Sequence, residues 1–509
     1  MSAGDSLDFP IEEASIADLA QALASGRATS AQLVAAYLER IAALDRAGPE
    51  LRAIIETNPD ALEIAEELDR ARATNGPRGP LHGIPILLKD NIDTADRMHT
   101  TAGSLALLDA RPARDATVAA LLWSGGAVLL GKANMSEWAN FRSTHSSSGW
   151  SARGGQARNP HSLDRSPCGS SSGSASAVAA SLCAAALGTE TDGSILCPGA
   201  ANGVVGIKPT LGLTSRAGVI PIAHSQDTVG PFGRTVADAA LLLRAISARD
   251  ARDPATAASV GRVPDDYRQF LDADGLRGAR IGIPREVFFG YSEKADAVAE
   301  AAITALRTAG AEIVDPTDIA TAKRMNESES ELTVLLYEFK ADLNAYLGAL
   351  NPEAAVHSLE ELIAFNSAHA AEELPYFGQE LLIRAQEKGP LTEEAYLTAL
   401  EENHRLARAE GIDAVMDAHH LDALCMPTGG PAWKIDLIDG DHGLGGASTP
   451  TALAGYPAIT VPAGESFGLP IGLTFMGRAY SEPTLIRLAY AFEQATHARR
   501  TPAYRTSTP

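Results

Sequence analysis

The spacing of hydrophobic residues predicts helices at the start of the chain and short buried strands soon after. Apolar positions follow a helical period over residues 15–26 and again over residues 29–41, each behind a Ser or Thr that can cap a helix. A polar helix is expected over residues 60–73. The apolar runs 83–90 and 127–130 are short and continuous, which is typical of buried strands.

The pattern changes several times further along the chain. Residues 143–176 are rich in Ser, Gly, Asn and Arg, which predicts a long structured loop. Residues 174–187 are small and apolar on every face, which predicts a fully buried helix. The stretch 250–421 is charged and helix-forming, with one strand at 280–284, and strand patterning returns before a closing helix over 482–499. Because strands and helices interleave from end to end, the pattern favours a layered α/β sandwich.

Composition and charge exclude several classes of partner. Hydrophobic residues make up 45% and charged residues 21%, as in ordinary soluble proteins. The formal net charge of -22 disfavours nucleic acid or an anionic membrane as a partner. No apolar run approaches the roughly 18 residues of a membrane span. Residues 1–10 are polar and acidic, without the pattern of a signal peptide.

The cysteine pattern points to a reducing compartment. No two of the four cysteines form a Cys-x-x-Cys pair, so we expect neither a disulfide nor a metal site, and a cytoplasmic location. These cysteines are Cys168, Cys183, Cys197 and Cys425.

Two tracts place serines beside glycines. The first is Pro167-Cys-Gly-Ser-Ser-Ser-Gly173, and the second is Gly188-Thr-Glu-Thr-Asp-Gly-Ser194. A Ser/Gly tract is usually a flexible linker, but the buried helix predicted between these two argues against that interpretation. The amides at the start of that helix face the first tract, which suits an oxyanion or a deprotonating serine.

Two motif matches do not indicate a functional site, and the residues alone do not decide which side chain is the catalytic base. Residues 169–173 match a nucleophile elbow centred on Ser171, yet no strand precedes them. Residues 126–133 imitate a phosphate-binding loop but lack its hydroxyl. Twelve histidines are present, none in a distinctive setting, while Lys89 and Lys208 could each be a desolvated, neutral base.

Several motifs together resemble the amidase signature family. They cover nearly the whole chain in the family's order: Leu88-Lys-Asp-Asn91, the first Ser/Gly tract, Gly188 to Ile195 with Pro198, Gly203 to Thr210, Asp227-Thr-Val-Gly-Pro231, Pro457 to Pro462 and Gly468 to Gly472. The resemblance implies a single domain over 1–509 with a large mixed sheet between helical layers. Within it we expect a catalytic core over 60–250, a helical layer or insertion over 250–421 and a return to the core sheet over 422–509.

The resemblance also assigns roles. It implies a Ser–Ser–Lys triad in which Ser194 is the acylated nucleophile, Ser170 the proton relay and Lys89 the base. We expect their side-chain atoms to form a chain of contacts of about 2.6–3.2 Å. The implied oxyanion hole is made by the backbone amides of Thr191, Asp192, Gly193 and Ser194, and the supporting residues are Gly169, whose peptide bond to Ser170 the family keeps cis, and Ser171. No cofactor, metal or obligate partner subunit is implied.

One departure from the common family motif bears on the substrate. Many members read Gly-Gly-Ser-Ile-Arg where this chain has Asp192-Gly-Ser-Ile-Leu196, which is most similar to the peptide amidases. The expected activity is therefore release of ammonia from C-terminally amidated peptides through an acyl-enzyme. A broad-specificity aryl- or alkyl-amide hydrolase, or a non-catalytic binding protein on the same scaffold, are the alternatives. The expected partner is a small-molecule or short-peptide amide.

Overall fold

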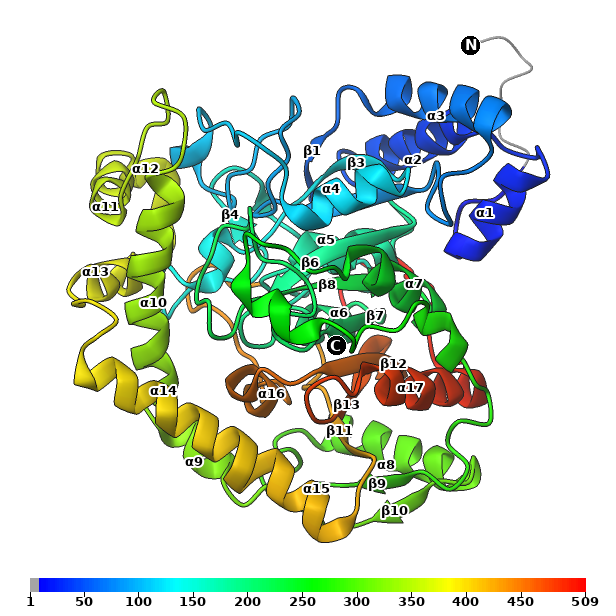
Figure 1. Cartoon of the computed structure of the whole chain (residues 1–509), viewed down its shortest axis with the longest axis vertical. Helices are drawn as coiled ribbons and strands as arrows, with labels where there is room; N and C mark the ends of the chain where they lie inside the picture. The colour runs from blue at the N-terminus through cyan, green and yellow to red at the C-terminus, as the bar shows by residue number, and fades with distance from the viewer. Residues whose placement is uncertain (1–8) are drawn as a thin grey trace.

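The architecture is that of a large mixed sheet with helices packed around it. The computed structural model describes residues 9–509, so most of the stretch 1–10, in which no signal-peptide pattern was expected, lies outside the described residues. No helix in the described part is long and apolar enough to cross a lipid bilayer. Figure 1 shows the sheet through the middle of the molecule and the helices of the chain's middle region along its left and lower sides.

The central sheet has eleven strands within residues 9–509. Its order is β1-β3-β2-β6-β8-β7-β12-β13-β11-β9-β10, with β2 parallel to both β3 and β6 and most later pairs antiparallel. The strands are β1 Ile54–Thr57, β2 Pro85–Lys89, β3 Val128–Ala133, β6 Ala185–Glu190, β7 Val205–Lys208, β8 Thr228–Gly233, β9 Arg280–Gly282, β10 Glu312–Val314, β11 Ala423–Pro427, β12 Ala458–Ser466 and β13 Leu469–Met476; β4 Trp150–Ser151 and β5 Gly155–Gln156 form a separate hairpin.

The helices form layers against this sheet and an outer rim. Buried apolar side chains of the sheet and of the flanking helices make two large cores, one around β2, β3 and β6 and one around β11, β12 and β13. The helices are α1 Ile16–Ala24, α2 Ser30–Leu44, α3 Ala61–Asn75, α4 Thr117–Ser124, α5 Ser172–Ala179, α6 Leu196–Ala201, α7 Val236–Ile246, α8 Glu293–Thr308, α9 Ala322–Glu327, α10 Ser330–Leu347, α11 Leu359–Ala368, α12 Ala370–Glu373, α13 Glu380–Gln386, α14 Glu394–Ala407, α15 Asp413–His419, α16 Thr449–Ala454 and α17 Glu482–Thr496.

The α/β sandwich is confirmed, and so are the predicted helix starts near the N-terminus. The Ser15 hydroxyl accepts the backbone N–H of Asp18 at the start of α1, and Thr29 does the same for Gln32 at the start of α2. The expected strand at 280–284 is present as β9, and the structure adds β10 beside it.

The prediction of one buried helix over 174–187 is wrong in its second half. Helix α5 ends at Ala179, Ser181 takes a left-handed φ of 53°, and Ala185–Glu190 is strand β6. Strand β6 lies between β2 and β8 and is buried on both faces, so its residues show no alternation of polar and apolar positions. A uniform apolar run of this kind cannot be told from a buried helix by its period.

The middle helices are tied to the core through a buried arginine. The Arg142 guanidinium donates to the Glu137 carboxylate and to the backbone carbonyl of Glu373, at the end of α12. The Glu373 carboxylate in turn accepts the Ser104 hydroxyl at 3.1 Å and the backbone N–H of Leu105 at 2.7 Å. One ion-pair cluster therefore joins the helical rim to two loops of the core.

Candidate active site

Lys89 is the last residue of β2, an interior strand of the central sheet, and its side chain is fully buried. Its Nζ lies 2.8 Å from Ser170 Oγ, 2.8 Å from Thr189 Oγ1 and 3.3 Å from the Thr189 carbonyl oxygen. Asn91 Nδ2 donates to the same Thr189 hydroxyl at 3.0 Å. Among residues 9–509, every hydrogen-bond partner of the lysine is thus a neutral oxygen.

Burial lowers the pKa of Lys89 to about 7, because an ammonium loses its hydration there. The negative charges of Asp227 and Glu190 oppose this effect and keep the pKa from falling further. A lysine with this pKa is substantially neutral near physiological pH and can accept a proton.

Two adjacent serines at the start of α5 make different contacts. Ser170 is fully buried, follows a cis peptide bond from Gly169, and turns its hydroxyl to Lys89. The Ser171 hydroxyl instead donates to the Thr189 carbonyl at 3.0 Å and accepts the Thr189 N–H at 3.2 Å, which fastens the start of α5 to β6. Ser170 is therefore the one of the two that lies beside the lysine.

The turn after β6 presents a run of backbone amides. The N–H groups of Ile195 and Leu196 both donate to the Glu190 carboxylate, at 2.7 and 2.9 Å. Within residues 9–509, the amides of residues 191–194 donate to no protein acceptor. The Glu190 carboxylate thus fixes the two positions that follow these four amides. Four consecutive amides without a partner can bind an anionic oxygen.

Ser194 lies at the end of this turn, and only 7% of it is exposed. Its carbonyl oxygen accepts the backbone N–H of Ser171 at 3.3 Å, which joins the turn to the start of α5. The expected contact between the Ser170 and Ser194 hydroxyls is not among the hydrogen bonds of the described chain. The structure thus brings Lys89 and Ser170 into the expected contact and places Ser194 beside them through its backbone.

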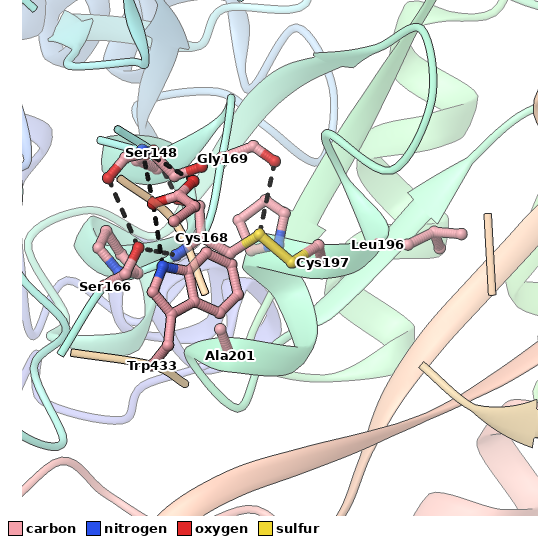
Figure 2. The surroundings of a disulfide bond; sticks show 12 residues. Ser148, Ser166, Cys168, Gly169, Leu196, Cys197, Ala201 and Trp433 are labelled. Carbon is pink, nitrogen blue, oxygen red and sulfur yellow. Dashed lines mark hydrogen bonds between the residues drawn. A yellow bond between two sulfur atoms is a disulfide. The ribbon is translucent and has the colours of Figure 1, made fainter. Parts of the chain in front are cut away.

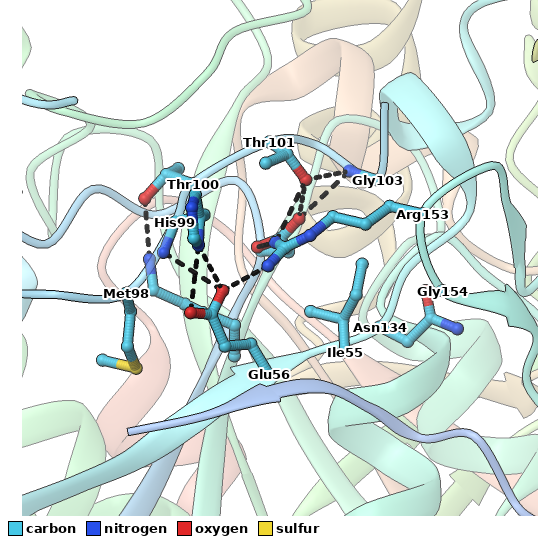
Figure 3. Close-up of polar contacts among 12 residues, drawn as sticks. Ile55, Glu56, Met98, His99, Thr100, Thr101, Gly103, Asn134, Arg153 and Gly154 are labelled. Atoms are coloured by element: carbon cyan, nitrogen blue, oxygen red, sulfur yellow. Dashed lines mark hydrogen bonds and ion pairs between the residues drawn. The ribbon is translucent and has the colours of Figure 1, made fainter. Parts of the chain in front are cut away.

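A charged network fixes the chain directly after Lys89's strand. The Asp90 carboxylate accepts the Thr101 hydroxyl, the Gly103 N–H at 3.1 Å and the Arg153 guanidinium at 3.3 Å. Arg153 also pairs with Glu56 on β1 (Figure 3). Burial raises the pKa of Asp90, and the positive charge of Arg153 opposes that rise. The network holds the end of β2 against the β4–β5 hairpin.

The expectation that the cysteines form no disulfide is wrong. Cys168 and Cys197 are bonded, with their Cα atoms 6.0 Å apart, while Cys183 and Cys425 are free and buried. Trp433 lies against this disulfide (Figure 2). The spacing of 29 residues gave no sign of the pair, because it is the packing of α6 beside the start of α5 that brings the two cysteines together.

Lys208, the second lysine considered from the sequence, is also buried but has another role. Its Nζ donates to the backbone carbonyl of Thr451, within α16, at 2.9 Å and to that of Tyr456, just after α16, at 2.6 Å. Burial lowers its pKa to about 8. Because it contacts neither serine, the geometry favours Lys89 as the candidate base.

One group of described residues has the geometry of a metal site. His224, Glu338 and Asp342 point their ligand atoms at one another. Their contacts within the protein already account for this arrangement, because His224 Nδ1 lies 2.8 Å from Asp342 and Glu338 accepts the Tyr396 hydroxyl at 2.7 Å. None of the contacts of Lys89 or Ser170 involves these residues.

Sequence reasoning missed several residues of the site. Thr189 and Asn91 lie within recognised motifs but carried no assigned role, and Glu331 from the helical middle region gave no local signal. Asp227 accepts the Thr191 hydroxyl at 2.5 Å, and Gln226 Nε2 reaches Glu331 at 2.9 Å and the Thr191 carbonyl at 3.4 Å. Only the folded chain places these side chains beside the turn.

Comparison with known proteins fits this geometry. The family model described as Amidase matches residues 32–486. The chain therefore belongs to the amidase family, and it is an enzyme that hydrolyses amides.

Individual relatives show which amidases the chain is similar to. The chain is similar to a native peptide amidase from Stenotrophomonas maltophilia, with 54% identity and a TM-score of 0.92, over 97% of this chain and 99% of that one. A probable amidase from Arabidopsis thaliana is 45% identical over 97% of this chain and 92% of its own length. An amidase family protein from Bacillus anthracis, known from its crystal structure, is 36% identical to this chain. The match has a TM-score of 0.87 and covers 97% of this chain and 92% of that one.

Proposed function

We propose that this amidase releases ammonia from the C-terminal amides of peptides by means of a Ser–Ser–Lys triad. The observation that carries the proposal is the contact of 2.8 Å between Lys89 Nζ and Ser170 Oγ, beside a turn whose four amides have no protein acceptor in the described chain. The similarity to a peptide amidase supports the choice of substrate.

The contacts of Lys89 suit it to be the base. A neutral lysine has two N–H groups and one lone pair. The two oxygens of Thr189 can accept both N–H groups, which leaves the lone pair directed at the Ser170 hydroxyl. Ser170 can then give its proton to Lys89 and take one from Ser194.

The reaction follows from this relay. As Ser194 Oγ attacks the amide carbonyl, its proton passes to Ser170 and the Ser170 proton passes to Lys89. The carbonyl oxygen becomes an oxyanion held by the amides of residues 191–194. The relay then runs in reverse and protonates the departing nitrogen, so ammonia leaves and an acyl-enzyme remains. Water attacks the acyl-enzyme through the same relay and releases the acid. In this scheme the Ser170 and Ser194 hydroxyls meet when substrate binds, as catalytic contacts commonly do.

A labelling experiment tests the triad. A fluorophosphonate probe should label the wild-type chain at Ser194, and Ser194→Ala should lose both labelling and ammonia release. Lys89→Ala should retain the fold and lose turnover at neutral pH. Ser171→Ala is the matched control for Ser170→Ala, because its hydroxyl serves the backbone of Thr189 and not the lysine. Failure to label Ser194 would overturn its assignment as the nucleophile.

A substrate comparison tests the specificity. Ammonia release from peptide amides should exceed release of amine from simple anilides and alkyl amides of similar size. A strong preference for anilides would favour a broad-specificity aryl- or alkyl-amide hydrolase on the same triad.

The division of the chain and its location also belong to this proposal. We propose a catalytic core over 60–250, a helical layer or insertion over 250–421 and a return to the core sheet over 422–509. We also propose a cytoplasmic location.

A further inference from the structure

The side chain of Asn202, at the end of α6, joins the two segments that carry the candidate catalytic serines. Its Nδ2 donates to the backbone carbonyl of Pro167 at 2.9 Å and to that of Pro198 at 2.8 Å. Pro167 lies three residues before Ser170, and Pro198 lies four residues after Ser194. One amide group therefore holds both segments through a forked pair of hydrogen bonds, called the fork below.

A third contact fixes the orientation of this amide group. Asn202 Oδ1 accepts the hydroxyl of Ser176, on α5, at 3.0 Å. The carbonyls of Pro167 and Pro198 can only accept, so the amide nitrogen must face them and the amide oxygen must face the hydroxyl. Asn202 is fully buried, and both polar atoms of its side chain have partners within the protein.

Two other links join the same segments. The disulfide of Cys168 with Cys197 lies one residue from each end of the fork. The backbone N–H of Ser171 donates to the carbonyl of Ser194 at 3.3 Å. A thiol reductant opens a disulfide, whereas the amide of Asn202 is neither reduced nor titrated. The fork is therefore the side-chain link that persists in a reducing compartment.

We propose that Asn202 is a positioning residue for amide hydrolysis: its fork holds the turn that carries Ser194 in a fixed place relative to Ser170. The inference rests on the proposed function, since the proton transfer between the two serines is the step that the fork aligns. Lys89 reaches Ser170 from β2, so that contact does not depend on the turn. The place of Ser194 depends on the links between the two segments, and a displacement of about 1 Å in a reacting group can cost about 100-fold in rate.

Substitution of Asn202 by Ala tests the role. The variant loses both donors of the fork, so kcat should fall about 10- to 100-fold with little change in KM, because the relay acts in the transition state and not in substrate binding. Ser176→Ala is the matched control: it removes the third hydrogen bond of the same amide and leaves the fork in place, so its kcat should stay within about threefold of wild type. Rates are expressed per active site titrated with the fluorophosphonate probe, so unfolded molecules do not count.

A second substitution keeps the size of the side chain. In Asn202→Asp the carboxyl can still accept from Ser176, but it donates to one carbonyl when protonated and to neither when ionised. Its kcat should lie between those of Ser176→Ala and Asn202→Ala, at least about threefold below the control. Circular dichroism reports whether each variant folds, and Asn202→Asp replaces Asn202→Ala in every comparison if the latter does not.

Reduction of the disulfide separates this role from a purely structural one. After dithiothreitol has opened the Cys168–Cys197 bond, as a thiol titration verifies, the kcat of Asn202→Ala should fall at least about threefold further than that of wild type, which keeps the fork. A residue that only stabilises the fold would leave both proteins equally sensitive to reductant.

Two results would overturn the inference. One is a kcat per titrated site in Asn202→Ala equal to that of Ser176→Ala, and the other is an equal loss of kcat on reduction in Asn202→Ala and wild type. Failure of the proposed function is seen separately, because the probe would then not label Ser194 of the wild-type chain, and the inference would fall with it.

Discussion

Thr189 offers two oxygen atoms to Lys89, its hydroxyl at 2.8 Å and its backbone carbonyl at 3.3 Å. The hydroxyl also accepts from Asn91 at 3.0 Å, so it is held in place from a second side. Because both oxygens belong to one residue of β6, the direction of the lysine's lone pair is set by the central sheet and not by a mobile loop.

Replacing Thr189 by Val should therefore impair the base without removing it. The variant keeps the shape of the side chain but loses the hydroxyl, so we expect kcat to fall about tenfold or more as the lysine loses its orientation. The acid limb of the pH profile should move to lower pH, because the ammonium form loses an acceptor that stabilised it. Thr189→Ser restores the hydroxyl and should restore both quantities. Unchanged kinetics in Thr189→Val would contradict this role.

The pKa of Lys89 predicts the acid side of the pH–rate profile. The folded pKa of about 7 lies below the ordinary 10.5, and only the neutral amine accepts a proton. Below pH 7 the lysine is protonated, so kcat/KM should fall about tenfold per pH unit, and it should reach a plateau just above pH 7. Initial rates of ammonia release from pH 5 to pH 8 measure this limb. A limb centred near pH 10 would mean that the lysine is not desolvated in solution.

The same burial should make Lys89 a cost to stability. Because its pKa is lower in the folded state than in the unfolded state, the unfolded chain binds more protons between pH 7 and pH 10.5, and stability rises with pH across that window. Lys89→Met should consequently raise the free energy of unfolding by about 2 kcal/mol or more at pH 6 and by less at pH 9. Urea unfolding at both pH values measures the difference.

Lys208→Met is the matched comparison for that experiment. This lysine is equally buried, but its Nζ satisfies two backbone carbonyls near α16, which the substitution would leave without a donor. We expect it to destabilise the protein. Stabilisation by both substitutions to the same extent would mean that burial of any lysine, and not the setting of Lys89, explains the result.

The Cys168–Cys197 disulfide predicts both the number of free thiols and a contribution to the free energy of unfolding. Under denaturing conditions without reductant, a thiol reagent should titrate two thiols per chain, Cys183 and Cys425, and all four cysteines after reduction. The Cys168→Ser, Cys197→Ser double variant should lose about 3 kcal/mol of unfolding free energy, the usual magnitude for a bond closing a loop of this length. Four thiols in protein purified without reductant would support the cytoplasmic location expected from the sequence.

Local pattern predicted the parts of the fold that depend on neighbouring residues. Ser15 and Thr29 cap helices where the hydrophobic period begins, and the run ending at Lys89 is a buried strand. The hydrophobic pattern predicted a helix where the structure has strand β6, because burial on both faces of this strand removes any alternation of polar and apolar residues over 185–190. The order of eleven strands follows from pairings between distant segments, which no local pattern contains.

The candidate site likewise has residues that the sequence predicted and residues that only the folded chain brings together. The resemblance to the family's motifs predicted that Lys89 lies beside Ser170, and the structure has this contact. The expected contact between the Ser170 and Ser194 hydroxyls is not present among the described residues, and the roles of the three residues remain a proposal. Glu331 lies on α10, more than a hundred residues after the turn, and its partner Gln226 comes from a third segment. Their meeting depends on tertiary packing, as does the pairing of Cys168 with Cys197.

The cluster of Arg142 with Glu137 and Glu373 has a consequence for engineering. The middle helices touch the catalytic part of the molecule at several separate points. Among them, Glu373 accepts from Ser104, and Glu331 accepts from Gln226, which also donates to the Thr191 carbonyl. A chimera that exchanged these helices between relatives would have to carry over the matching loops as well. Substrate range and catalytic rate should therefore be inherited together in this scaffold, and recombination breakpoints are best placed where neither of these contacts is cut.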